Sequence, residues 1–599
     1  MAFWGNNVDD KEVFYQQSMK KITKFLKKNF YLILCMIGVI GVIFCNALAW
    51  NGSYGDGDGY MRLIRIKQWL SNPTYWEQKI FVSNYPFGEV LHWTRPVDLL
   101  WILMSYPFLL AVGLDDALFL GGAFLSPVLG VLGVIGLGYG LRRIFNVWLA
   151  MLGGFFFLNH HIVQAEFSFF KADHHSFMIV LLVFAFSELL CWIGKRKNRY
   201  LWGSAFAIAL SSLVMIDGII FAVLFTGYFV YQYIFKGMSI AFAYRFVRNY
   251  VIFIIIAWVS NPCFEGLFYI DNSRLSILFI IAFGLLGVGF KILELVKLHT
   301  FKLKLVSVLC IGGIVSVCLL SWYGKKVFSM PVSSEVFDIW ASMISETKPI
   351  WKMSGARMFS IYFTLLSALL LGVFLIYKGV NKRILWVNCF IGGWIFLLSI
   401  LSVRFSRYFP IFEIVPYLCL IEKVYKNSSF YMNKEGDFPA KVYLIILFVL
   451  SISPISLVPQ SFLTEADKIN YYHPIVVAKI REIGGTLVAD TFLTPRYVYD
   501  AGVNTVSTPY HRNVEGIVDG VSILFSEDDE KLLDLLLKHK VSQVLVFEEN
   551  EDKFYDMSAE NSNKLYWRLI KRQNIPYCLE EIETGVSYAR LFRVRIKVD

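Results

Sequence analysis

The sequence predicts a mainly α-helical, polytopic membrane protein with about 13 transmembrane helices, followed by a small α/β domain. Apolar stretches long enough to cross a bilayer, separated by short polar loops, fill residues 31–458. Hydrophobic residues make up 56% of the 599 residues and charged residues only 17%, which is too apolar for a soluble chain of this length. Lys and Arg cluster in alternate loops, which sets the expected orientation in the membrane.

The formal net charge of +11 does not indicate a nucleic-acid partner. The basic residues lie beside apolar spans, where Lys and Arg fix orientation and meet anionic lipid head groups. A nucleic-acid-binding domain would instead carry a basic stripe with interleaved aromatic residues. The nine cysteines show neither a disulfide framework nor zinc-ligand spacing, and all but Cys578 lie in or beside apolar stretches.

Residues 1–30 are expected to form a cytoplasmic segment, because a cluster of lysines precedes the first apolar run, 31–50. A cleaved signal peptide is the alternative, since Ala47-Leu48-Ala49 resembles a peptidase site. The apolar run is about 20 residues long and exceeds the usual signal core of about 7 to 15 residues. We therefore expect a retained anchor that leads outward.

The next apolar stretch, 97–113, is short and contains Pro107. If it crossed the membrane, Arg142 and Arg143 would lie outside, together with the later basic clusters. We therefore predict a helix that lies on the outer leaflet or dips into it.

The remaining apolar stretches alternate so that every basic cluster faces the cytoplasm and the acidic loops face outward. This pattern predicts a multi-pass protein of the inner (plasma) membrane with a catalytic membrane domain over 31–458. The expected later spans are 117–141, 147–165, 176–194, 200–215, 218–235, 249–262, 275–296, 305–323, 358–377, 384–402, one span before Lys423 and Lys426, and 441–458.

The composition changes after the last span, and residues 459–599 are expected to form an extracytoplasmic α/β domain of about 140 residues. A helix-like segment, 527–540, ends in Lys and His. Strand-like runs occur at 486–489, 543–547 and 586–596.

The first outer loop is rich in glycine and carries Asp56 and Asp58. Carboxylates on such a backbone can approach a divalent cation closely, and oxygen ligands suit magnesium, manganese or calcium. A calcium loop of the EF-hand type is excluded because its twelfth position is Lys67. Alternatively, Asp58 caps an amphipathic helix whose polar face carries Arg62 and Arg65.

Three further outer segments carry candidate groups. Lys171-Ala172-Asp173-His174-His175 could bind a metal, or the histidines could make ordinary interfacial hydrogen bonds. Glu346, in the long outer loop, could also be a solvated charge. Arg404 and Arg407 end an apolar span, where snorkelling to head groups is the default role. Glu413, inside a later span, is an intramembrane charge and a functional candidate without an assigned role.

Taken together and in order, these motifs resemble those of the oligosaccharyltransferase catalytic subunit family, in the C-type glycosyltransferase superfamily. The chain is also similar to bacterial relatives of this family whose second motif is Asp-His-His. The matching segments are Asp58-Gly59-Tyr60, Asp173-His174-His175, Ser345-Glu346-Thr347-Lys348-Pro349 and Arg404-Phe405-Ser406-Arg407-Tyr408.

The resemblance implies a C-type glycosyltransferase fold, a polyprenyl-diphosphate-linked sugar donor and a divalent metal, Mg²⁺ or Mn²⁺. It implies that Asp58 and Glu346 are catalytic and bind the metal together with Asp173 and His175. Arg404 would lie near the donor diphosphate, and His174 is also expected to contact substrate. A metal with cationic side chains would neutralise charge that develops on the leaving diphosphate.

Two features depart from the family pattern. His175 stands where better-known members have a second acid, which softens the metal site. The Trp-Trp-Asp motif that recognises an Asn-x-Ser/Thr acceptor is absent, so protein N-glycosylation does not follow.

Trp93 and Arg95 are weaker candidates for substrate binding. Trp93 could stack on a sugar ring, and Arg95 could bind a diphosphate. Alternatively, the two residues belong to the aromatic belt at the membrane interface. The Tyr510-His511-Arg512 segment is expected to brace the α/β domain or to shape an acceptor surface.

The sequence therefore predicts a glycosyltransferase that moves a sugar or oligosaccharide from a polyprenyl-linked donor to an acceptor outside the membrane. One alternative is a monosaccharide transferase that uses a polyprenyl-monophosphate sugar. A lipid-linked glycan transporter or flippase is the alternative from another class, and it would place charges in mid-membrane and show paired repeats. A structural membrane scaffold is a further alternative. The acceptor, whether glycan, lipid or protein, is not predicted.

Overall fold

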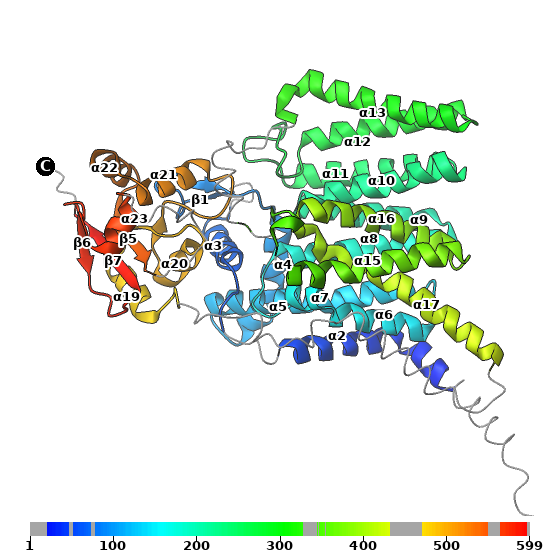
Figure 1. Ribbon diagram of the computed structural model, residues 1–599, viewed down its shortest axis with the longest axis horizontal. Helices are drawn as coiled ribbons and strands as arrows, with labels where there is room; N and C mark the ends of the chain where they lie inside the picture. The colour runs from blue at the N-terminus through cyan, green and yellow to red at the C-terminus, as the bar shows by residue number, and fades with distance from the viewer. Residues whose placement is uncertain are drawn as a thin grey trace, which may run out of the picture.

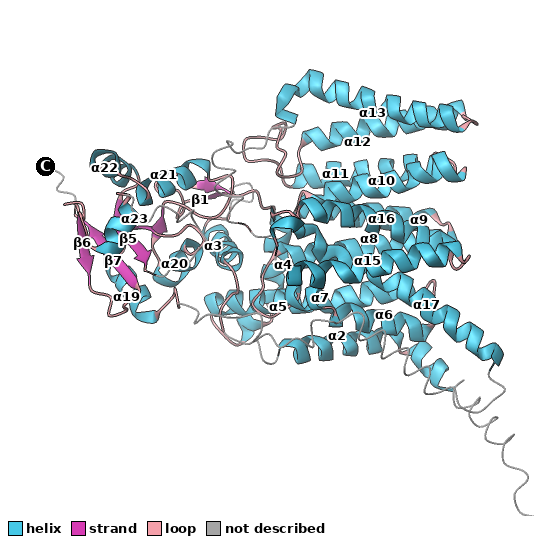
Figure 2. Cartoon of the chain, viewed as in Figure 1, coloured by secondary structure: helices cyan, strands magenta, loops and turns pink. Residues whose placement is uncertain are grey.

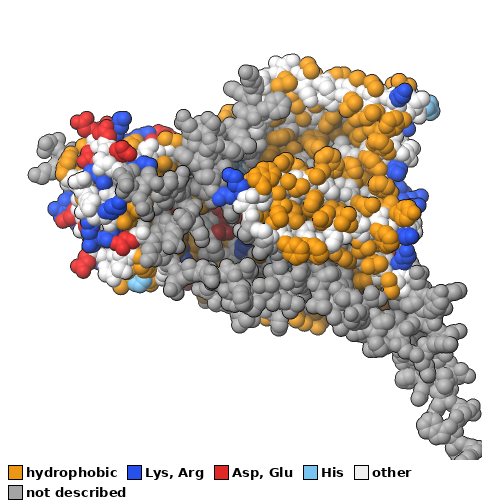
Figure 3. All heavy atoms as spheres, in the orientation of Figure 1, with side chains coloured by type: hydrophobic (Ala, Val, Ile, Leu, Met, Phe, Trp, Pro, Cys, Tyr) orange, Lys and Arg blue, Asp and Glu red, His pale blue; other side chains and the backbone are white. Residues whose placement is uncertain are grey.

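The computed structural model describes residues 21–46, 52–73, 78–327, 344, 347–353, 355–431, 470–548 and 563–595. It has two parts, a bundle of long helices and an α/β domain, with helix α3 (Gly57–Ser71) between them (Figure 1). On the face shown in Figure 3, the described surface of the bundle is largely hydrophobic, and Lys and Arg gather at the end away from the α/β domain. The protein is a multi-pass membrane protein: among the described residues, seven helices are long and apolar enough to cross a bilayer.

A helix occupies each expected span up to residue 431. The helices are α2 (Phe30–Asn46), α5 (Leu114–Leu141), α6 (Val147–Asn159), α7 (His161–Glu166), α8 (His174–Lys195), α9 (Asn198–Val214), α10 (Asp217–Lys236), α11 (Ala241–Ser260), α12 (Ile277–Val296), α13 (Phe301–Tyr323), α15 (Gly355–Tyr377), α16 (Lys382–Leu401) and α17 (Phe409–Tyr431). The expected span 441–458 lies outside the described residues.

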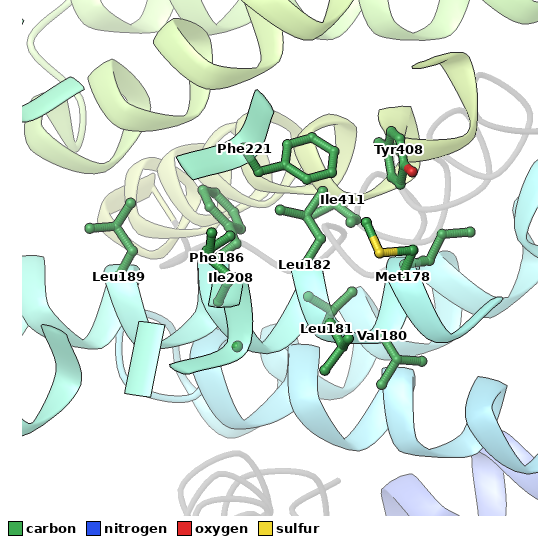
Figure 4. Close-up of a cluster of buried hydrophobic side chains, with 14 of the residues drawn as sticks. Met178, Val180, Leu181, Leu182, Phe186, Leu189, Ile208, Phe221, Tyr408 and Ile411 are labelled. Atoms are coloured by element: carbon green, nitrogen blue, oxygen red, sulfur yellow. The ribbon is translucent and has the colours of Figure 1, made fainter. Parts of the chain in front are cut away.

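Helix α8 is the centre of the bundle because it is apolar on all sides. It packs against α5 and α9, and side chains such as Leu182 and Phe186 meet Phe221 and Ile411 from other helices (Figure 4). The contact with α5 requires a glycine, since a Cβ at Gly140 would come within 2.6 Å of the Ser187 side chain. This close packing holds the amino end of α8 in a fixed position.

The span predicted over 147–165 is not continuous, and this prediction was wrong. Helix α6 ends at Asn159 and α7 restarts at His161, because His160 is extended and its Nδ1 accepts a hydrogen bond from the Ile162 N–H. The Nε2 atom of His160 lies 3.0 Å from Glu413, which also accepts a hydrogen bond from Thr364. Glu413 is therefore a buried, partnered charge.

The apolar stretch 97–113 forms a short helix, α4 (Arg95–Ser105), and a 3₁₀ turn, η1 (Phe108–Leu110). Eleven residues of helix cannot cross a bilayer. Leu103 and Leu110 are exposed on this segment, as expected for an element that contacts lipid without spanning it.

The α/β domain contains a five-stranded mixed sheet in the order β4-β3-β5-β7-β6, drawn in magenta in Figure 2. Strands β3 and β4 and strands β3 and β5 pair in parallel, and β7 is antiparallel to β5 and β6. The expected strands and the expected helix 527–540 are present. The elements are α19 (Pro474–Ile483), β3 (Thr486–Val488), α20 (Thr494–Ala501), β4 (Asn504–Thr505), α21 (Val514–Leu524), α22 (Asp529–Lys538), β5 (Val541–Phe547), α23 (Leu565–Lys571), β6 (Leu579–Ile582) and β7 (Ala589–Val594).

The α/β domain is bonded to the first outer loop, which also forms a small antiparallel ribbon of β1 (Lys79–Ile80) and β2 (Glu89–Val90). The Thr505 N–H donates to the Val82 carbonyl at 2.8 Å, and the Tyr85 N–H donates to the Thr505 carbonyl at 3.1 Å. Behind these backbone bonds, the Thr508 hydroxyl lies 2.8 Å from a carboxylate oxygen of Glu89. These bonds fix the domain over the end of the bundle.

Glu89 should make the docking of the domain sensitive to pH. Burial raises the pKa of Glu89 to about 7, from 4.5. The docked state therefore keeps a proton that the undocked state releases, and stability should fall as pH rises between these two values, by at most about 3 kcal/mol. Thermal unfolding or limited proteolysis across this pH range measures the slope.

Glu89→Gln should flatten that slope and raise stability above neutral pH, because a neutral amide replaces the buried carboxylate. The matched control is Glu527→Gln, which removes an exposed carboxylate from the α/β domain. An unchanged slope in Glu89→Gln contradicts the prediction.

Candidate functional site

The two acids of the first outer loop have different local roles. Asp56, with extended backbone, is the N-cap of α3, and its carboxylate accepts a hydrogen bond from the Gly59 N–H at 3.2 Å. Asp58 lies in the first turn, so the alternative in which Asp58 is the cap is wrong. Position 59 must be glycine because a Cβ there would come within 2.9 Å of the Tyr54 ring. The loop thus places both carboxylates at the amino end of α3.

The second motif is compact and buried. Asp173 is the N-cap of α8 and accepts a hydrogen bond from the His175 N–H at 3.3 Å. His174 Nδ1 lies 2.7 Å from one Asp173 oxygen, and His175 Nε2 lies 3.7 Å from the other. One ligand atom from each of the three side chains lies within 4.8 Å of the others. An aspartate that begins a helix and is followed by two histidines therefore forms one donor cluster.

The structure brings the two acidic segments together. Burial, and then the Asp56 and Asp173 charges, raise the pKa of Asp58. Burial and the Asp173 charge raise the pKa of Asp56 to about 6, while Lys171 opposes them. Burial alone would raise the pKa of Asp173, but His175, His174 and Lys171 hold it well below its usual range. Asp58 and Asp173 thus lie in one electrostatic cluster.

Cationic groups surround this cluster. Lys171 lies 3.1 Å from Glu166, and Arg407 lies 3.9 Å from the same carboxylate. Arg404 follows α16 in a 3₁₀ turn, η5 (Val403–Tyr408), and its Nη2 donates to Asp217 at 2.7 Å. The Tyr408 hydroxyl donates to the other Asp217 oxygen at 3.0 Å. Asp217 therefore orients Arg404, whose side chain remains partly exposed.

Glu346 lies outside the described residues, so its predicted role stays a prediction. The following residues of its motif are described. The Lys348 carbonyl accepts a hydrogen bond from the Val403 N–H at 3.2 Å. The end of the long outer loop therefore lies beside Arg404.

The other predicted substrate residues make contacts within the protein. Trp93 is buried, with the Arg62 guanidinium 4.4 Å from its ring centre and the Tyr510 ring 4.8 Å away. Arg95 is buried and stacks over Trp69 at 4.5 Å. His174 belongs to the Asp173 cluster. These positions assign internal contacts to all three, and their substrate contacts stay predictions.

The Tyr510-His511-Arg512 segment connects the two parts of the protein. Arg512 forms ion pairs with Asp271 and Glu265, in the loop between α11 and α12. The His511 ring lies 4.6 Å from the His92 ring, and burial followed by the Arg512 charge lowers the pKa of His511 to about 4. These contacts support the bracing role.

Tyr510 has a second role that the sequence did not indicate, since it lies beside Asp58, and hydrogen bonding to the Tyr510 hydroxyl lowers the pKa of Asp58. Burial is the first cause of the raised pKa of the Tyr510 hydroxyl, and the Asp58 charge is the second. The α/β domain therefore contributes a side chain directly to the acidic cluster. A Tyr in a Pro-Tyr-His-Arg run was the available signal, but only the fold shows what it faces.

No protein-family model matches the chain, and no curated protein matches it by sequence. Solved structures match its fold. The archaeal oligosaccharyltransferase AglB from Archaeoglobus fulgidus, in complex with an inhibitory peptide and a dolichol-phosphate, aligns with a TM-score of 0.69 at 15% identity, over 96% of this chain and 75% of that chain. The apo oligosaccharyltransferase of that organism aligns with a TM-score of 0.65 at 13% identity, over 88% and 70% of the two chains.

A third structure, the Archaeoglobus fulgidus oligosaccharyltransferase in complex with Zn and sulfate, aligns with a TM-score of 0.60 at 14% identity, over 87% of this chain and 68% of that chain. At these identities the similarity establishes the fold. The chain therefore has the membrane-helical, α/β-capped fold of the archaeal oligosaccharyltransferase over nearly its whole length, as its motifs predicted.

Proposed function

We propose that the protein is a metal-assisted membrane glycosyltransferase. It transfers a sugar or oligosaccharide from a polyprenyl-(di)phosphate-linked donor to an acceptor on the outer face of the membrane. The observation that carries the proposal is the cluster of Asp58, Asp173 and His175, placed where the bundle meets the α/β domain on an oligosaccharyltransferase fold. Lys and Arg gather at the end of the bundle away from the α/β domain (Figure 3), whereas Tyr510 of that domain lies beside Asp58, which supports the assignment of the cluster to the outer side.

The residues present fit a divalent cation. Two imidazoles and one carboxylate of the second motif lie within ligand-bridging reach, and two more carboxylates crowd the same cluster. Carboxylates this close repel one another, and a cation relieves that repulsion. Mixed nitrogen and oxygen donors suit manganese or zinc better than magnesium. When bound, the metal would supply Lewis-acid stabilisation of the leaving phosphate.

The protein's own side chains would bind the ion, the acceptor and the leaving phosphate. Asp173, His174 and His175 would hold the ion, and Asp58, at the tip of α3, would face the acceptor. Arg404 is oriented by Asp217 and provides a fixed positive charge for the phosphate that leaves with the lipid. Lys171 is held in its charged form by Glu166, Asp173 and Asp56, which outweigh the effect of burial on its pKa. It provides a second positive charge beside the cluster.

The first experiment measures metal binding without activity. Purified protein is titrated with Mn²⁺, and binding is followed by calorimetry or by the electron paramagnetic resonance signal of free Mn²⁺. Asp173→Asn and His175→Gln should each weaken binding by at least about tenfold, because each removes a ligand.

The control is His299→Gln, which alters an exposed histidine between α12 and α13. Its affinity should equal that of the unmodified protein. Equal affinity in all the variants would reject the metal site while leaving the fold assignment unaffected.

The second experiment measures transfer. Membranes that contain radiolabelled polyprenyl-diphosphate-linked sugar are supplied with the protein, and loss of label from the lipid fraction is followed. Asp58→Asn should slow this loss by about 100-fold or more, since it removes a charge from the reacting centre. A chelator should have the same effect, and added Mn²⁺ should reverse it.

Asp115→Asn is the matched control. Asp115 is an exposed acid of α5 that pairs with Lys67, and Lys67 lies on the same helix as Asp58. It should retain transfer. Normal transfer by Asp58→Asn, with its fold verified by thermal unfolding, would overturn the proposal. Lipid translocation without transfer in every variant would favour the flippase.

A further inference from the structure

The short helix α7 leads from the membrane bundle to the second motif. It begins at the break that His160 makes in the expected span, and only residues 167–172 separate its last residue, Glu166, from Asp173. It packs against η5, the turn that carries Arg407. The contacts that fix α7 therefore also fix the approach of the chain to the acidic cluster.

His160 links the start of α7 to helix α17. Its Nδ1 accepts a hydrogen bond from the Ile162 N–H at 3.2 Å and so caps α7. An imidazole whose Nδ1 accepts carries its proton on Nε2, which lies 3.0 Å from one Glu413 oxygen. The Thr364 hydroxyl donates to the other oxygen at 2.8 Å. The Glu413 carboxylate therefore holds the His160 ring in the orientation that caps α7.

A second contact holds the other end of α7. Glu166 lies 3.9 Å from the Nε atom of Arg407. The earlier residue of the α7 segment, His160, meets the later residue of the other segment, Glu413. The α7 segment thus runs antiparallel to the junction of η5 and α17 and is held to it at both ends. We call these two contacts, His160–Glu413 and Glu166–Arg407, the α7 clamp.

Both contacts of the α7 clamp are shielded from solvent. All four side chains are at most 10% exposed. A carboxylate inside a membrane bundle is costly to bury, and such groups typically serve a functional site. Glu413 had no assigned role, and α7 connects it to the acidic cluster.

The α7 clamp places the Lys171 ammonium beside the acidic cluster. The second oxygen of Glu166 lies 3.1 Å from Lys171 Nζ. The Lys171 carbonyl accepts hydrogen bonds from the Ser126 hydroxyl and from the Asp173 N–H, which fixes the backbone as well. Burial raises the pKa of Asp56, and the Lys171 charge opposes this rise. Lys171 is therefore close enough to act on the carboxylates of the cluster.

We propose that His160 and Glu413 are positioning residues that act through α7. They hold Glu166 in place, and Glu166 holds the Lys171 ammonium beside the metal-binding residues. The positioning of Lys171 rests on the contacts alone, whereas its effects on a bound cation and on transfer rest on the proposed function.

The first test is hydrogen exchange, followed by mass spectrometry, on the full-length protein in lipid nanodiscs. His160→Asn keeps an oxygen that can cap α7 but is too short to reach Glu413. Glu413→Gln has one acceptor oxygen, which cannot serve both His160 and Thr364. In each variant the amides of residues 161–172 should exchange at least about tenfold faster, because one end of α7 is released.

The matched control is Asn388→Leu, which removes a buried amide that donates to the Phe412 carbonyl of α17 at 2.8 Å. It takes a polar contact from the same helix, one residue from Glu413, and should leave exchange over 161–172 unchanged. Unchanged exchange in both clamp variants overturns the proposal. Equal acceleration in Asn388→Leu also overturns it, since the bundle as a whole would then be loosened.

The second test separates the positioning of a charge from support of the fold, through the affinity for Mn²⁺. Lys171→Gln should tighten binding about tenfold, because it removes a positive charge beside the ion. His160→Asn and Glu413→Gln release Lys171 and should tighten binding about threefold. Glu413→Gln combined with Lys171→Gln should bind no tighter than Lys171→Gln alone, because both act through one group.

Weaker or unchanged Mn²⁺ binding in the clamp variants rejects the positioning of Lys171, since loss of structural support has that effect. Transfer should fall about tenfold in both variants, as expected for a misplaced charged contact, and unchanged transfer would also reject the role. If the unmodified protein neither binds Mn²⁺ nor transfers sugar, the proposed function fails, and hydrogen exchange alone still decides whether His160 and Glu413 hold the segment that carries Lys171.

Discussion

The Asp98 carboxylate is the contact on which the site geometry depends. It lies in the first turn of α4 and binds Arg62 and Arg65 of α3, so it locks one helix across the other. The Arg62 guanidinium also covers Trp93, whose ring meets Tyr510 of the α/β domain. Because all these groups are buried, the register of α3 has little freedom, and Asp58 at its tip is carried to a defined place beside Asp173.

Hydropathy and charge were sufficient to predict most of the membrane domain. Apolar length locates the helices whatever their neighbours are, so spans such as α8 and α12 were found almost to the residue. The break at His160 escaped prediction, because it depends on a contact with Glu413 from a helix far along the chain. The sequence placed Arg62 and Arg65 on a polar face of α3 but did not predict that the fold buries both.

The acidic cluster was partly predictable for a different reason. Its motifs are short, local and placed on one side by the topology, so Asp58, Asp173 and His175 could be named from the sequence. The partners that fix their chemistry come from elsewhere: Tyr510 from the α/β domain beside Asp58, and Asp217 from α10 beside Arg404. Asp98 gives no signal in the sequence, since a single acid in the first turn of a helix is common. Only the fold shows the three guanidiniums, of Arg62, Arg65 and Arg95, that surround it.

The backbone bonds between Thr505 and the Val82–Tyr85 segment have a consequence for the sheet. Strand β4 is an edge strand of the sheet, and the outer loop acts there as an additional, short neighbour. If the carboxyl-terminal domain were separated from the bundle, the unshielded edge would present free amide and carbonyl groups to other molecules. Self-association of the isolated fragment is the expected result, so the membrane part serves the α/β domain as a protective flank as well as an anchor.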